Sequence, residues 1–197
     1  LKFAVLFALL ASVGFAQAEV KMFGTMDAGF SDVKAPGSAA SSTNFTSGGM
    51  TTSNLGFKGT ENLGSGNRAF FELSSFLSVG NGATLGGSTA NTFARSAFVG
   101  VGSDKMGSVS LGRQSNPSFL PTILFNAFGD SSAYGPLWHA TYFGNTGNKS
   151  TQMYNDTAWD SSVSYTTPNM SGARATVMAS KTGAGQNSGA NVMYFKD

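Results

Sequence analysis

The chain has 197 residues, a formal net charge of +2 and no cysteine, and 11% of its residues are charged, against roughly 25% in typical soluble domains. It contains 26 glycines and 17 phenylalanines but only 5 prolines. This composition favours short strands joined by turns and argues against a helical soluble enzyme. The small net charge and the lack of a basic run argue against a nucleic-acid partner.

Residues 1–18 predict a secretory signal peptide. Lys2 precedes an apolar run, and Ala16-Gln17-Ala18 forms an A-x-A cleavage site before Glu19. A membrane anchor is the alternative, but the apolar run is shorter than the roughly 20 residues that span a bilayer. An exported chain without cysteine must be stabilised by packing, metal or backbone pairing. The single histidine, His139, argues against a histidine-based metal site, and we expect no metal or cofactor.

Alternating polar and apolar residues predict a series of β-strands. The first strand is expected over residues 21–30, with Met22, Met26 and Phe30 on one face. Residues 53–73 predict a hairpin around a turn at 62–67; one face carries Leu55, Phe57, Phe71 and Leu73, and the other carries Asn54, Gly56, Lys58, Arg68 and Glu72. Further strands are expected over residues 93–101, 108–112, 159–165, 173–180 and 190–195.

The connections between these strands predict a membrane barrel. Short turns at 62–67, 102–107 and 167–172 alternate with long polar segments at 31–51, 77–91 and about 114–150. Membrane β-barrels alternate short periplasmic turns with long external loops, and their strands must close because lipid offers backbone groups no partner. Aromatic residues at strand ends indicate an interfacial girdle: Phe23, Phe30, Trp159 and Tyr165. We therefore predict an all-β fold, a transmembrane antiparallel β-barrel; a soluble, secreted, ligand-binding β-sandwich is the weaker alternative.

Several blocks, in order along the chain, resemble the Gram-negative general porins. They are residues 20–29 (VKMFGTMDAG), 54–64 (NLGFKGTENLG), 95–101 (RSAFVGV), 107–114 (GSVSLGRQ) and 162–168 (SVSYTTP). The resemblance implies a trimer of 16-stranded barrels in which the third long loop, here about 114–150, folds into the lumen. On this expectation residues 19–197 are the N-terminal part of one porin barrel and hold roughly its first 8 strands.

The resemblance implies an outer-membrane porin, exported by a Gram-negative bacterium, that passes small hydrophilic solutes and ions by passive diffusion. The expected partners are these solutes, outer-membrane lipid, lipopolysaccharide and two further copies in a homotrimer. The alternative is a non-conducting outer-membrane barrel that acts as an anchor or adhesin. No catalytic residue is expected, because the carboxylates are scattered without the spacing of a reacting pair.

Strand alternation predicts an inward-facing set of candidate pore residues: Thr25, Asp27, Asn54, Lys58, Arg68, Glu72 and Arg95. The resemblance implies that Arg95 is a wall base and that Asp130 lies near the acidic tip of the third loop. Asn54 stands where the family often has Arg, Thr25 where it can have Lys, and Thr157 and Ala158 where a further Arg is expected.

Each candidate also has a structural alternative. Lys58 and Arg95 could be ordinary solvated side chains, and Glu72 could pair with a base on a neighbouring strand. Family analogy makes Arg113 a subunit-interface or loop-anchoring residue. With fewer wall bases than the family pattern, we expect at most a mild anion preference.

Overall fold

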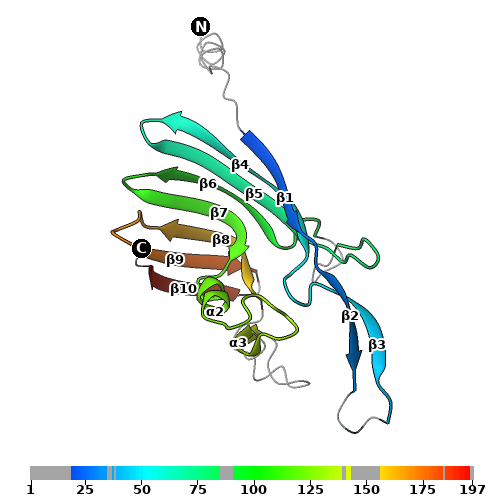
Figure 1. The fold of residues 1–197 in the computed structure, drawn as a ribbon. Coiled ribbons are helices and arrows are strands. Elements are labelled where there is room, and N and C mark those ends of the chain that lie inside the picture. Colours follow the sequence, from blue (N-terminus) through cyan, green and yellow to red (C-terminus); the bar gives the residue numbers. More distant parts are fainter. Residues whose placement is uncertain are drawn as a thin grey trace.

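The computed structural model describes residues 19–34, 37, 39–84, 91–138, 141–142, 156–183 and 185–195, and its main feature is a curved, eight-stranded antiparallel sheet (Figure 1). The strand order is β1-β4-β5-β6-β7-β8-β9-β10, and every neighbouring pair is antiparallel. The strands are β1 Glu19–Thr25, β4 Asn54–Gly64, β5 Asn67–Phe76, β6 Ser96–Ser103, β7 Gly107–Ser115, β8 Ala158–Thr166, β9 Ala173–Thr182 and β10 Gly185–Tyr194. The sheet confirms the predicted class and strand number, and within the described residues it is open, with β1 and β10 at its edges.

The expected first strand over residues 21–30 is wrong. β1 ends at Thr25, and Ala28–Val33 forms β2, which pairs with β3 (Ser42–Ser47) in a hairpin separate from the large sheet. The strand is interrupted at residues 26–27, because the Asp27 carboxylate accepts hydrogen bonds from the backbone N–H groups of Met50 (2.7 Å) and Thr51 (3.2 Å). The connection between β1 and β4 (26–53), referred to below as the first loop, therefore contains two strands. They pack through an edge-on contact between the rings of Phe30 and Phe45.

The remaining connections follow the predicted rhythm up to the last pair of strands. Residues 65–66, 104–106 and 167–172 make the short turns, and 77–95 and 116–157 are long connections at the opposite end of the sheet. The β9–β10 connection lies at the long-loop end but spans only residues 183–184, so the strict alternation of short and long is wrong there. β10 also begins five residues before the expected strand at 190.

The β7–β8 connection (116–157) is referred to below as the third loop, and its described residues include two short helices, α2 (Phe119–Leu124) and α3 (Pro136–Trp138). Within the described part of the chain, neither helix has the length and hydropathy needed to cross a membrane. The predicted signal peptide at 1–18 and His139 lie outside the described residues.

The register sorts the sheet into two chemically different faces. One row of paired residues reads Gly59, Phe71, Val99, Leu111 and Val163, and the adjacent row reads Lys58, Glu72, Phe98, Gly112 and Ser162. We call the first side the apolar face and the second the polar face.

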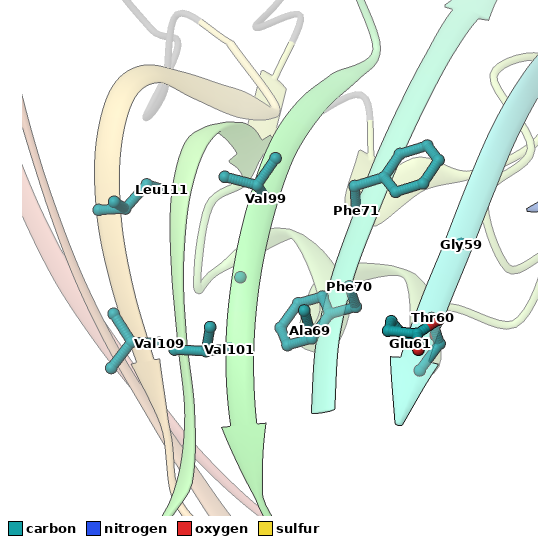
Figure 2. A pocket seen from close by; sticks show the side chains of 11 residues that line it. Gly59, Thr60, Glu61, Ala69, Phe70, Phe71, Val99, Val101, Val109 and Leu111 are labelled. Atoms are coloured by element: carbon teal, nitrogen blue, oxygen red, sulfur yellow. The ribbon is translucent and has the colours of Figure 1, made fainter. Parts of the chain in front are cut away.

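The apolar face is the exposed one. Val99 is 60% exposed and Val163 is 51% exposed, whereas Ser162 on the polar face is 2% exposed. Figure 2 shows Phe71, Val99, Val101, Val109 and Leu111 around a hollow of about 430 Å³, bordered by Gly59. A broad exposed apolar surface on a single-layer sheet is what a lipid-facing wall requires and what a soluble sandwich would bury.

Candidate functional site: the polar face and its loops

Most charged side chains of the sheet belong to the polar face, whereas register places Glu61 and Lys181 on the apolar side. Register places five basic residues there or against it, and two acidic residues: Lys21, Lys58, Arg68, Arg95, Arg174, Glu19 and Glu72. Strand pleating alone produces this sorting, because residues two apart along a strand share a face. The polar face consequently carries an excess of positive charge.

At the β1–β4 flank, Lys58 lies over the ring of Phe23, with its Nζ 5.1 Å from the ring centroid. This cation–π contact holds the ammonium against the wall without neutralising its charge. Thr25 pairs with Asn54 at the long-loop end of the same strands. Asn54 is 8% exposed, and its side-chain amide donates to the carbonyl of Thr52 at 2.9 Å.

Arg95 reaches the polar face from just outside β6. β6 begins only at Ser96, so strand alternation does not fix the side of Arg95, and its contacts do. Its guanidinium lies 3.5 Å from Glu72 Oε1 and 3.4 Å from Ser74 Oγ, both on the polar face. Arg95 is thus the kind of basic neighbour that Glu72 was expected to pair with if its role is structural.

Arg68 lies at the other end of the wall. Its guanidinium forms a 3.0 Å ion pair with Asp104 in the short turn after β6, and both side chains are well exposed. Arg68 and Arg95 therefore mark opposite ends of the polar face, and the structure does not bring all the predicted charges into one ring.

Arg113 joins the two ends of the third loop. It is near the end of β7, and it donates to Asp156 Oδ2 (2.8 Å), Asp160 Oδ1 (3.0 Å) and the carbonyl of Ala94 (2.6 Å). Its side chain is only 16% exposed. This geometry matches the loop-anchoring role rather than a position among the wall bases.

A buried asparagine closes the base of the same loop. Asn116 is 1% exposed; its backbone N–H donates to Thr157 O at 2.9 Å and its Nδ2 to Asp156 O at 2.8 Å. Its Oδ1 accepts from the Tyr142 hydroxyl at 3.2 Å. Beyond this base, Asn191 of β10 donates to the Pro117 carbonyl at 2.6 Å, which places the start of the loop against the polar face.

The remaining two candidates, Asp27 and Asp130, lie in the loops. Asp27 occupies the break between β1 and β2 described above. Asp130 accepts from the hydroxyl of Thr51 at 2.9 and 3.0 Å and from the backbone N–H of Thr52 at 3.3 Å. The third loop is therefore joined to the chain segment that precedes β4.

The expected aromatic girdle is largely wrong. Phe23 and Trp159 belong to the polar face, and Phe30 lies in the β2–β3 hairpin. Tyr165 is the one member of the predicted set on the apolar face, near the short-turn end, where its hydroxyl donates to the Met106 carbonyl at 2.9 Å. Alternation alone misplaced Trp159, because the β7–β8 register shifts between Gly112 and Gln114.

Sequence reasoning missed the residues that hold the loops. They are Thr51, Ser53, Asn116, Ser131 and Asn191. Only Asn116 had a local signal, since its Oδ1 accepts from the backbone N–H groups of Ser118 (3.1 Å) and Phe119 (3.0 Å), a turn typical of an Asn-Pro-Ser sequence. The others bond to residues far away in the chain and leave no periodic trace.

An open antiparallel meander with an exposed apolar face and a charged, loop-covered opposite face defines a membrane protein of the β-barrel class. The family model described as Gram-negative porin matches residues 4–195. The chain belongs to the Gram-negative porin family, whose place is the outer membrane.

Two comparisons agree with this assignment. The chain is 32% identical over 181 residues to an outer membrane porin protein of Bordetella pertussis; the match covers 84% of this chain and 44% of that protein. The fold is similar to that of the anion-selective porin from Comamonas acidovorans, with a TM-score of 0.73 and 23% identity over 92% of this chain and 55% of that one. The chain thus spans about half the length of the relatives it matches.

Proposed function

We propose that the protein forms a water-filled channel through which small hydrophilic solutes and ions diffuse passively across the outer membrane. The observation that carries the proposal is the separation of the two faces. One side of the sheet is exposed and largely apolar, and the other bears most of the charges and receives the third loop. A wall of this kind meets lipid outside and water inside.

The third loop supplies the means of narrowing such a channel. It contacts β10 through Asn191 and Pro117, and it contacts the segment before β4 through Asp130 and Thr51. These contacts lie toward opposite flanks of the polar face, which supports a loop that crosses in front of the wall. We propose that Arg95, Lys58, Glu72, Asn54 and Thr25 line the passage beside it.

The charge of the wall supports a mild preference for anions. Five basic and two acidic side chains belong to the polar face, and Glu72 and Glu19 each lie beside a base. Unit charges 4 Å apart interact by about 4 kcal/mol at an intermediate effective dielectric, so the unpaired excess sets the local potential. Lys58 and Arg174, which have no carboxylate within ion-pair distance among the described residues, contribute most to this excess.

The apolar face has room for two kinds of neighbour, membrane lipid and further copies of the chain. We propose that the protein assembles as a homotrimer, as the family assignment suggests, and that the rest of the face contacts lipid and, at the long-loop end, lipopolysaccharide. The proposal includes no cofactor and no catalytic step.

Recording from planar lipid bilayers with protein purified from outer membranes tests this function. Insertion should produce stepwise increases in current, and small sugars should swell liposomes that contain the protein. A preparation that retains its native assembly, inserts fully and yields neither steps nor swelling would overturn the proposal and favour the anchor or adhesin alternative.

A further inference from the structure

A junction between the first and third loops stands out from the rest of the molecule. We define it as residues 48–53, which precede β4, together with Asp27 and residues 130–133 of the third loop. Three bonds run from the third loop to the carbonyls of two glycines: Ser131 Oγ to Gly49 O (2.8 Å), Ser132 Oγ to Gly48 O (2.8 Å) and Ala133 N to Gly49 O (3.0 Å). The partners of the two serines are 82 and 84 residues away in sequence.

The first loop forms a fixed platform for these bonds. Asp27 accepts from the backbone of Met50 and Thr51, and its own backbone N–H donates to Ser53 Oγ at 2.9 Å. Ser53 is 2% exposed and Ser131 is fully buried. A buried polar cluster whose members satisfy one another holds a single geometry, because each group that loses its partner incurs a desolvation penalty.

The carboxylate of Asp130 is directed into this junction. Both of its oxygens accept from the hydroxyl of Thr51, and one also accepts from the Thr52 N–H. None of the ion pairs among the described residues includes Asp130. Its oxygens are thus engaged with neutral donors of the first loop and have no base of the wall as a direct partner.

We propose that Asp130 is a positioning residue: it holds the tip of the third loop on the first loop through Thr51, and it does not act as a selectivity charge for permeating ions. The docking is a property of the fold alone. Its consequence for permeation, a third loop held still beside the wall, rests on the proposed channel function.

A disulfide can test the docking directly. A Cβ added at Gly49 would lie 3.7 Å from the Cβ of Ala133, within the roughly 3.5–4.5 Å of disulfide-bonded pairs. The sequence has no cysteine, so Gly49→Cys with Ala133→Cys forms the only pair. Oxidation should protect both thiols from alkylation, as counted by mass spectrometry. Two free thiols in a folded protein would show that the loops are not docked.

Two variants separate positioning from selectivity. Asp130→Asn removes the charge, whereas Thr51→Val removes only the hydroxyl that the charge binds. Positioning predicts the same result for both: cleavage within the third loop by added protease rises on the order of tenfold, and open-channel current noise increases. Thr60→Val, a loss of a threonine hydroxyl from the polar face outside the junction, is the matched control and should change neither.

The same disulfide tests whether fixing the two loops together reverses the effects of Asp130→Asn. In the Asp130→Asn background, the oxidised Gly49–Ala133 cross-link should restore slow cleavage and a quiet current, and reduction should abolish both. If Asp130→Asn instead shifts the reversal potential while Thr51→Val and the cross-link have no effect, Asp130 is a pore charge and the proposal is wrong. If the wild-type protein does not conduct, the channel function fails, and the alkylation and protease measurements still decide the docking.

Discussion

Replacing Arg113 with alanine should loosen the base of the third loop far more than removal of any exposed arginine. The guanidinium connects the carbonyl of Ala94 with Asp156 and Asp160, so it links the end of the β5–β6 connection, the end of the third loop and the start of β8. Ala94 is 6% exposed, and a buried carbonyl that loses its donor costs about 1–3 kcal/mol.

The two ion pairs of Arg113 add less. Asp156 and Asp160 are 47% and 56% exposed, so water replaces much of what each carboxylate loses, and we assign the pairs together about 0.5–1 kcal/mol. The sum, about 1.5–4 kcal/mol, corresponds to an increase in local opening of roughly tenfold to several hundredfold, since each 1.4 kcal/mol is about a factor of ten.

Hydrogen exchange measures this opening. The reporter is the backbone N–H of Asn116, which donates to Thr157 O. Arg113→Lys keeps the charge but loses the planar fork, and should fall between the wild type and alanine. Arg68→Ala is the matched control, because Arg68 and Asp104 are 40% and 72% exposed and their pair contributes at most a few tenths of a kcal/mol by the usual behaviour of surface pairs. Equal exchange at Asn116 in Arg113→Ala and Arg68→Ala would refute the reasoning.

Further substitutions test the two faces, the backbone and the wall of the channel. Val99→Lys puts a charge in the middle of the apolar face and should cost about 2–4 kcal/mol of unfolding free energy in lipid, measured by urea titration, whereas Thr60→Lys on the polar face should cost little; equal losses would contradict the assignment of the faces. Gly112→Ala should destabilise the sheet by more than about 2 kcal/mol in the same titration, because φ is +130° and the new Cβ would meet the Ala97 carbonyl. Gly64→Ala, with φ of +83° and open space around it, should cost only about 1 kcal/mol, and a reversed order of the two glycine variants would contradict these backbone conformations. Arg95→Ala should shift the reversal potential toward cations and more strongly than Arg68→Ala; an unchanged potential would remove Arg95 from the narrow part of the channel.

Much of the sheet was predictable because period-two alternation is a local signal. The hairpin expected over residues 53–73 corresponds to β4 and β5, and its apolar members Leu55, Phe57, Phe71 and Leu73 share one face. Exposure then shows that the apolar face is the outer one, because Leu55 and Phe57 are exposed while Asn54 is buried. Composition, through low charge and abundant glycine, had indicated only that the chain forms short strands joined by turns.

The failures have a common physical cause. The strand expected over residues 21–30 breaks because Asp27 bonds to Met50 and Thr51, and β3 escaped notice because Ser42–Ser47 has a single large apolar residue, Phe45. The loop junction likewise depends on partners about 80 residues apart. Contacts of this kind appear in no local pattern, and the family resemblance carried residue types but not their hydrogen bonds.

The candidate pore residues also divide into those that lie on strands and those that lie in loops or at strand ends. Lys58, Glu72 and Arg68 lie on strands, and their side of the sheet followed from counting residues. Arg95, Asp130 and Asp27 lie where strands end or in the loops, and only the folded structure shows which neighbours they meet. Their part in permeation stays a prediction that the recordings above can test.

The loop junction also limits which loop positions can change in sequence. Ser131 is buried and bonds to Gly49 of the first loop, and Ser53 is buried and holds Asp27 within the first loop, so an exchange at either residue would disturb the junction. Sequence changes in the loops should therefore be tolerated better outside residues 48–53 and 130–133 than within them.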